Sequence, residues 1–305
     1  MILDNKRAVS AALAAASLML PASGCSPAQQ QTQSNAGGSP LVAACTISTL
    51  CSLVSAVGGP DIQVHTIVPV GASPETYEPT PSDIVTVSHA AIIFENGEGL
   101  EAWLQRLINA SDAPNVRDVV LADGIPAAAR ASGNPHLWMD PVYAQTYVRE
   151  IEAGLAAVDP SRAADFQGNE TVELARLAKL DRWIAAQVAT IPPDRRVMIC
   201  FHDAWYYFDK RYGIKNVGAV EPSPGQEPSP EYFAKLIALA QANHVRAVFA
   251  EPQFSPKLAD ALASSAGIQT VEDLYDDTLG TSPGLSDYDG MMRYDVGVIV
   301  KAMKS

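Results

Sequence analysis

The chain has 305 residues, of which 48% are hydrophobic and 18% are charged, and its formal net charge is −13 at pH 7. This length allows one large domain or two lobes with their own hydrophobic cores. The acidic balance argues against a nucleic-acid partner and for tolerance of a cationic one, although the acidic residues are spread along the chain.

The N-terminus has the pattern of a secretory signal, in which two basic residues precede an apolar run at 11–20 that is too short to be kept as a membrane span. The small residues before Cys25 resemble the lipobox of bacterial lipoproteins. We therefore expect residues 1–25 to be a signal peptide with Cys25 as the lipidated residue, and residues 26–40 to be a flexible tether. The protein is then expected outside the cytoplasm, lipid-anchored to the cell membrane or periplasmic.

The four cysteines bear on the redox state of the protein. Cys25 stands at the expected processing site, Cys45 and Cys51 are six residues apart, and Cys200 is distant from all three. Disulfides persist in exported proteins, so Cys45 and Cys51 could form a small-loop bridge, but the odd thiol leaves the choice of partner open. Because the chain has no CxxC pair, a thiolate zinc cluster is not expected.

The rest of the chain alternates between strand-like and helical patterns. Seven strand-like segments are predicted: Leu41–Cys45, Ile62–Val70, Ala90–Glu95, Val116–Leu121, Val197–Phe201, Val245–Glu251 and Ile268–Leu274. The helical patterns between them favour an α/β fold with parallel sheets and right-handed crossovers. Ser229 and Pro230 predict the start of one helix, Ser255 and Pro256 the start of the next, and Gly267 its end.

Two long helical segments follow one another in the middle of the chain with no strand between them. Asp140 predicts the start of the first, and the second covers roughly 161–188, which corresponds to about 40 Å of helix. We interpret the second segment as a rigid linking helix. The predicted organisation is an N-terminal lobe at 41–140, a helical linker at 141–194 and a C-terminal lobe at 195–305.

Ligands of open parallel sheets bind beyond the carboxyl ends of the strands. Polar side chains that follow strands or lie in the adjacent loops are Glu75, His136, His202, Glu251 and Asp277. Either histidine alone would fit a core position, but two histidines with carboxylates suit a metal site better than a nucleophilic triad. The sequence contains neither a GxSxG elbow nor a GxxxxGK phosphate loop.

The other histidines and two loop acids have simpler interpretations. His65 lies inside a predicted strand, His89 precedes an apolar run, and His244 stands where a predicted helix ends, so none of the three is expected to bind metal. Glu78 and Glu227 directly precede prolines in loops, and we expect their carboxylates to bond to backbone amides.

Several motifs in order resemble one family over essentially the whole chain after the tether. They are VPVGASPETYEPTPSD, IFENGEGLEAWL, NPHLWMDP, CFHDAWYYFDKRYGI, EPSP, FAEPQFSPK and LYDDTLG. Together they look like the zinc- and manganese-binding solute-binding proteins of bacterial ABC transporters, the TroA-like or cluster A-I family. Many consecutive motifs at the right spacing are more specific than any single one.

The resemblance implies a monomeric receptor of two lobes, joined by the long helix, that holds one divalent metal ion in the cleft and delivers it to a membrane permease. It places the metal ligands at Glu75, His136, His202 and Asp277. Glu75 departs from the family, which usually has His there. Zinc-selective members often have a His-rich acidic loop near the second ligand, and 122–134 contains no histidine.

The implied ligand set bears on the choice of metal. Glu75 would give the site two nitrogen and two carboxylate donors in place of a nitrogen-rich set, and carboxylates suit Mn(II). Zn(II) still has the higher intrinsic affinity for most such sites, so selectivity for Mn(II) would have to come from the geometry of the site and the supply of metal. We therefore expect Mn(II) as the cargo, with Zn(II) a close second and iron a minor alternative.

Two further hypotheses belong to other classes of protein. The same His and carboxylate set could serve a periplasmic metallohydrolase, with an open water position on the metal and an acid as general base. Alternatively, Glu75 could mark a degenerate site in an adhesin-like lipoprotein. The resemblance favours a metal receptor that is not an enzyme.

Overall fold

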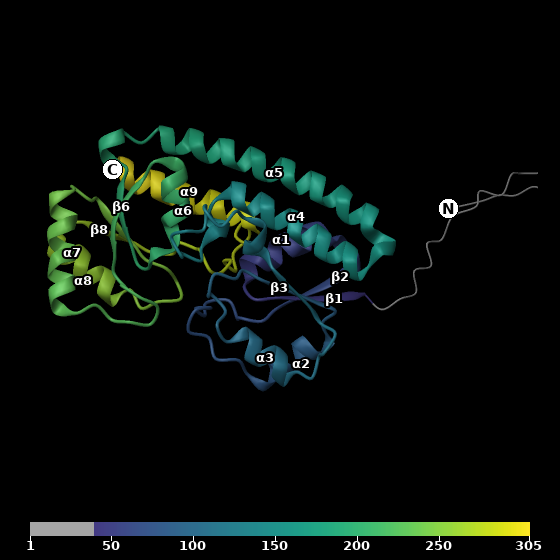
Figure 1. The fold of residues 1–305 in the computed structure, drawn as a ribbon. Helices are drawn as coiled ribbons and strands as arrows, with labels where there is room; N and C mark the ends of the chain where they lie inside the picture. Colours follow the sequence, from purple (N-terminus) through teal and green to yellow (C-terminus); the bar gives the residue numbers. More distant parts are fainter. Residues whose placement is uncertain (1–39) are drawn as a thin grey trace, which may run out of the picture. The chain divides into compact units, whose positions relative to one another are not determined.

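The computed structural model describes residues 40–305, so the predicted signal peptide, the lipidation residue Cys25 and the tether up to residue 39 lie outside the described residues. Within the described part, strands and helices alternate along the chain (Figure 1). None of the helices at 40–305 is long and apolar enough to cross a membrane.

Two parallel sheets form the centres of the two lobes. The first contains β1 (Leu41–Cys45), β2 (Ile62–Thr66), β3 (Ile92–Glu95) and β4 (Arg117–Val120), in the order β2-β1-β3-β4. The second contains β5 (Val197–Cys200), β6 (Lys215–Ala219), β7 (Ala247–Phe249) and β8 (Gln269–Val271), in the order β6-β5-β7-β8. All strand pairs are parallel, which confirms the predicted fold class.

The strand predictions hold in position, but one strand was missed and three segments were predicted too long. All seven predicted segments contain a strand, but β6 was not predicted, because its sequence KNVGA carries Lys215, Asn216 and Gly218 instead of an apolar run. The predictions over 245–251 and 268–274 are too long, since β7 and β8 cover Ala247–Phe249 and Gln269–Val271. The prediction over 62–70 is also too long, since β2 ends at Thr66. Pro69 has no amide hydrogen to continue the ladder, and the chain turns there into the loop that carries Glu75.

Helices cover both sheets. They are α1 (Ser48–Gly58), α2 (Pro81–His89), α3 (Leu104–Ala110), α4 (Pro141–Val158), α5 (Ala163–Ala189), α6 (Tyr206–Tyr212), α7 (Pro230–Ala242), α8 (Lys257–Ala266) and α9 (Tyr288–Lys304). Helices α1, α4, α5 and α9 contribute to the larger hydrophobic core, which also includes the inner residues of the first sheet. Helices α7 and α8 pack against the second sheet around a smaller core.

The predicted long helix is α5, and its 27 residues correspond to about 40 Å. Its apolar stripe is buried at Phe166, Leu177, Leu180, Ile184 and Val188. Helix α5 contacts α1 and α4 of the first lobe and also α6 and α9, so it links the two lobes along one side of the fold (Figure 1). The start predicted for α4 is confirmed, because the Asp140 carboxylate accepts a hydrogen bond from the amide of Val142.

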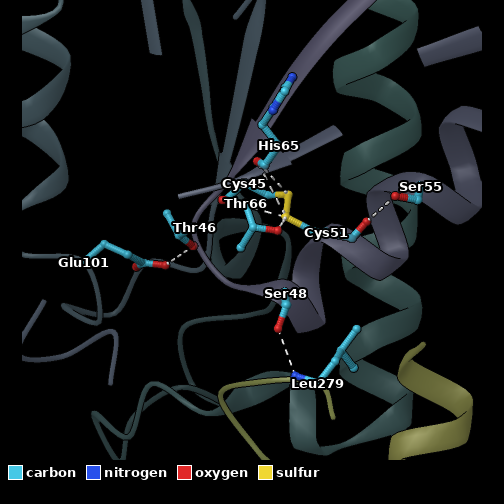
Figure 2. The surroundings of a disulfide bond; sticks show 9 residues. All are labelled: Cys45, Thr46, Ser48, Cys51, Ser55, His65, Thr66, Glu101 and Leu279. Carbon is cyan, nitrogen blue, oxygen red and sulfur yellow. Dashed lines mark hydrogen bonds between the residues drawn. A yellow bond between two sulfur atoms is a disulfide. The ribbon is translucent and has the colours of Figure 1, made fainter. Parts of the chain in front are cut away.

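A disulfide joins Cys45 at the end of β1 to Cys51 in α1 (Figure 2). This confirms the small-loop bridge and settles the choice of partner, since Cys200 is the free cysteine of the described residues and is buried. Inside the closed turn, the Ser48 hydroxyl accepts a hydrogen bond of 2.9 Å from the amide of Leu279 (Figure 2). The turn is therefore attached to the segment that follows Asp277.

Candidate metal centre

His136 lies in the loop before a short 3₁₀ helix, Leu137–Met139, and its side chain is held from one side. The Asn134 side-chain oxygen accepts from the His136 amide and lies 3.0 Å from Nδ1. The Asn134 amide group donates to the carbonyl of Asp203, which fixes the side chain in this orientation. Since the oxygen can only accept, Nδ1 carries the proton and Nε2 presents its lone pair to the interior.

His202 directly follows β5 and is held in the same way by a carboxylate. Its Nδ1 lies 2.5 Å from Oε2 of Glu251, which stands two residues beyond β7. Its Nε2 lies 3.1 Å from Nε2 of His136. A histidine that donates one ring N–H to a carboxylate and presents its other nitrogen inward has the arrangement typical of metal ligands.

Asp277 completes this group. Its Oδ1 is 3.6 Å from Nε2 of His136, and its Oδ2 is 3.8 Å from Nε2 of His202. Neither oxygen has a hydrogen-bond partner within residues 40–305, although the side chain is fully buried. Two imidazole nitrogens and an unpaired buried carboxylate facing one another are costly unless a cation lies between them. The donor set therefore fits a divalent metal ion.

The electrostatics agree with this interpretation. Burial raises the pKa of Asp277 well above its usual value, and the nearby Asp276 raises it further. Burial alone would lower the pKa of His202, but the carboxylates of Glu251, Asp276 and Asp277 raise it well above 6.5. Burial and the neighbouring charge of His202 lower the pKa of His136. In the protein without a bound ion, a proton on His202 therefore supplies the positive charge that these carboxylates favour.

Glu75 lies at the wall of the site. It lines a cavity of about 250 Å³ together with His136 and His202. Its loop is fixed by hydrogen bonds from the Trp103 indole to the carbonyl of Pro74, at 2.8 Å, and from the amide of Gly71 to the Thr278 hydroxyl, at 3.3 Å. Burial raises the pKa of Glu75, whereas the charge of His202 lowers it.

Of the four predicted ligands, the structure brings three together. The donor atoms of His136, His202 and Asp277 all lie within 4.8 Å of one another, and a second group of this kind joins His202 to Glu251 and Asp276. Glu75 belongs to neither group among the described residues.

Comparisons with known proteins identify the family. Residues 43–302 match the family of ZnuA, the periplasmic zinc-uptake complex component A. The chain belongs to this family. The resemblance inferred from the motifs is thereby confirmed, and the chain is a metal-binding solute-binding component of a transporter.

Curated relatives of this ZnuA-family chain are named after different metals. The manganese-binding lipoprotein MntA of Halalkalibacterium halodurans is 31% identical over 94% of this chain and 95% of its own length. The iron ABC transporter substrate-binding lipoprotein MtsA of Streptococcus pyogenes is 27% identical over 85% of this chain and 87% of its own length.

Solved structures share the fold. The periplasmic zinc-binding protein TroA of Treponema pallidum superposes with a TM-score of 0.82 at 24% identity, covering 88% of this chain and 100% of that chain. A crystal structure of ZnuA gives a TM-score of 0.77 at 26% identity over 87% of this chain and 99% of that chain.

Sequence reasoning missed three residues of the site. Asn134 holds His136, Asp276 adds a carboxylate beside His202, and Glu221 lines the cavity. Asn134 stands two residues before His136 in the NPH stretch, and Asp276 directly precedes Asp277 in the DDT stretch, so this proximity was an available signal. Glu221 follows the unpredicted strand β6, so nothing in the sequence placed it beside His202.

The residues with simpler interpretations lie elsewhere. His65 is in β2, His89 ends α2, and His244 follows α7, and none of them belongs to the metal-type groups found at 40–305. Glu78 and Glu227 are exposed. The expectation that they bond to backbone amides is wrong for the described chain, because neither carboxylate accepts any of its hydrogen bonds.

Proposed function

We propose that the chain is an extracytoplasmic, high-affinity receptor for one divalent transition metal ion, which it delivers to the membrane permease of an ABC importer. The observation that carries this proposal is the pair of opposed Nε2 atoms of His136 and His202, 3.1 Å apart, beside the unpaired carboxylate of Asp277. Glu75 supplies the fourth ligand from the first lobe. One relative is named a manganese-binding lipoprotein and another an ABC transporter substrate-binding lipoprotein, which supports binding and transport without turnover.

Mn(II) is the proposed cargo, with Zn(II) as the close alternative. Two imidazoles and two carboxylates neutralise a divalent ion and give an oxygen-rich donor set, which hard ions such as Mn(II) prefer. The curated relative with 31% identity is named after manganese. The zinc name of the family and the iron name of another relative are reasons to test all three ions.

Native mass spectrometry of the protein exposed to equimolar Mn(II) and Zn(II) tests this proposal. We expect one ion per chain, with Mn(II) retained in preference to Zn(II). Asp277→Asn should lose the ion, whereas His65→Ala, in β2 and outside the site, should keep it. Elemental analysis that finds no stoichiometric metal in the wild-type protein would overturn the proposal and favour a degenerate site.

The activity of the metal-loaded protein distinguishes a receptor from a metallohydrolase. The receptor should hydrolyse neither carboxylic esters nor phosphate esters. Hydrolysis by the wild-type protein that disappears in His202→Ala would contradict the proposal, because it would mean that the ion activates water for catalysis.

We also propose the predicted organisation of the chain in the cell. It comprises lipidation at Cys25, a tether to residue 40, lobes at 41–140 and 195–305 with the helical linker at 141–194 between them, and a monomeric state. The names of the relatives as lipoproteins support the anchor. Cys25→Ser should release the protein from the membrane fraction, and retention of this variant in the membrane would contradict lipidation at Cys25.

A further inference from the structure

Glu221 stands two residues beyond β6, at the edge of the sheet that carries His202. Its amide donates to the carbonyl of Phe201 over 2.7 Å, and the amide of Val220 donates to the carbonyl of Cys200 over 3.0 Å. The pairing of β5 with β6 therefore continues up to the residue before His202. Glu221 and His202 consequently emerge side by side at the carboxyl end of the second sheet, where ligands of such sheets bind.

The Glu221 side chain is buried in the cavity without a partner for one of its oxygens. The residue is 8% exposed and lines the same cavity of about 250 Å³ as Glu75, His136 and His202. Its Oε2 is enclosed and has no hydrogen-bond partner among the described residues. Burial raises the pKa of Glu221, and the nearby backbone amides of Gly225 and Gln226 offset this only in part. Burying a carboxylate oxygen in this way is unfavourable, and a cation in the cavity would compensate for it.

The turn that carries Glu221 touches the loop of Glu75. Gly225 has a φ of 71°, and a Cβ atom at this position would lie 3.2 Å from Cγ2 of Thr76. The turn at 221–225 thus packs against the residue next to Glu75. The two carboxylates come from different lobes, through segments that are in contact.

We propose that Glu221 is a ligand of the transported ion in this chain. The inference rests on the proposed function and extends its donor set to the imidazoles of His136 and His202 and the carboxylates of Glu75, Glu221 and Asp277. Three carboxylates raise both the number of oxygen donors and the negative charge around the ion. Such a site favours six-coordinate Mn(II) over Zn(II), which prefers four ligands in tetrahedral geometry.

The sequence provides a matched control, because the tetrapeptide EPSP occurs twice, at 221–224 and 227–230. Glu221 is buried at the cavity, whereas Glu227 is exposed. Titration calorimetry of wild type, Glu221→Gln and Glu227→Gln with MnCl₂ and ZnCl₂ therefore compares identical substitutions in identical local sequences. We expect Glu221→Gln to weaken Mn(II) binding at least about tenfold and Zn(II) binding less, and Glu227→Gln to leave both unchanged.

Two outcomes separate the failure of this inference from that of the proposed function. If the wild-type protein binds Mn(II) or Zn(II) and Glu221→Gln binds Mn(II) equally tightly, Glu221 is not a ligand but the receptor stands. If the wild-type protein binds neither ion, both proposals fail. Thermal unfolding without metal serves as the folding control, and Glu221→Gln should be at least as stable as wild type because burial disfavours the charge that it removes.

Cobalt substitution adds a spectroscopic test. Co(II) gives weak visible absorption in six-coordinate sites and strong absorption in tetrahedral ones. The wild-type protein should give the weak spectrum, and Glu221→Gln should give a stronger one because a neutral amide oxygen replaces the carboxylate and is a weaker donor to the ion. Identical strong spectra for both proteins would overturn the assignment.

Discussion

Replacing Glu251 by Gln tests how the second lobe prepares His202 for metal binding. Oε2 of Glu251 lies 2.5 Å from Nδ1 of His202, and both side chains are buried. The carboxylate keeps the proton on Nδ1, so that Nε2 is available, and it makes the ring a more basic ligand. Loss of such a partner weakens metal affinity roughly 10- to 100-fold, which corresponds to about 1.4 to 2.8 kcal/mol.

The same substitution should change how metal binding depends on pH. Burial alone would lower the pKa of His202, but Glu251, Asp276 and Asp277 raise it well above 6.5. An incoming ion must displace this proton, so wild-type affinity should fall about tenfold for each pH unit below that pKa. In Glu251→Gln the pKa of His202 is lower, because a negative charge is removed. Its affinity should therefore depend less on pH.

Mn(II) titrations of the wild-type protein and Glu251→Gln between about pH 6 and about pH 8, around the usual pKa of histidine, measure both effects. The difference in Mn(II) affinity between wild type and Glu251→Gln should be largest at the highest pH and should become smaller toward the lowest pH. Glu272→Gln, an exposed carboxylate just after β8, is the control and should match wild type. Equal affinity of Glu251→Gln and wild type at the highest pH, or parallel pH curves, would refute the reasoning.

Three further predictions concern stability. Replacing both Cys45 and Cys51 with Ala should lower the free energy of unfolding by about 2 kcal/mol, the loop-closure value for this short ring, as measured by urea denaturation. Trp138→Phe should cost about 1 to 3 kcal/mol in the same assay, because the carbonyl of Asp276 loses its indole donor. Burial raises the pKa of Glu251 and of Asp277, so the folded metal-free protein holds more protons than the unfolded chain, and its stability should fall as pH rises above about 4.5. Thermal melts should therefore show a stabilisation by Mn(II) that grows with pH.

Local signals predicted those helix boundaries that depend on contacts within a few residues of the chain. Asp140 begins α4 by capping the amide of Val142 at 2.8 Å, and Gly267 ends α8 with a φ of 74°. Both helix boundaries depend on neighbours a few residues away, so the sequence alone is sufficient to predict them. Strand β6 escaped prediction because its residues are half-polar and gain their order from pairing with β5, which a local pattern does not record.

The sequence indicated most of the site residues, but it only partly predicted how they are arranged in space. The residues themselves indicated His136, His202 and Asp277 as polar groups in loops or after strands, but only the resemblance to a family joined positions so far apart into one site. Glu221 shows what the sequence alone does not predict. Its place beside His202 follows from the pairing of β5 with β6, so missing the strand also meant missing the carboxylate.

The contacts around the site separate its ligands into two groups that depend on different lobes. Asp277 follows β8 of the second sheet, yet its neighbours are held by the first lobe. The Leu279 amide donates to Ser48 in the disulfide-closed turn (Figure 2). The Thr278 hydroxyl accepts from the amide of Gly71 in the Glu75 loop.

His202 and Glu221, by contrast, are positioned by the pairing of β5 with β6. A movement of the second sheet away from the disulfide-closed turn would therefore withdraw these two donors together and leave Glu75 and Asp277 in place. Because the remaining donors would be fewer and more exposed to water, the ion would be held less tightly. Because β5 also pairs with β7, we expect cargo release to require displacement of the second sheet as a unit, while the Cys45–Cys51 turn keeps Asp277 and the Glu75 loop in register.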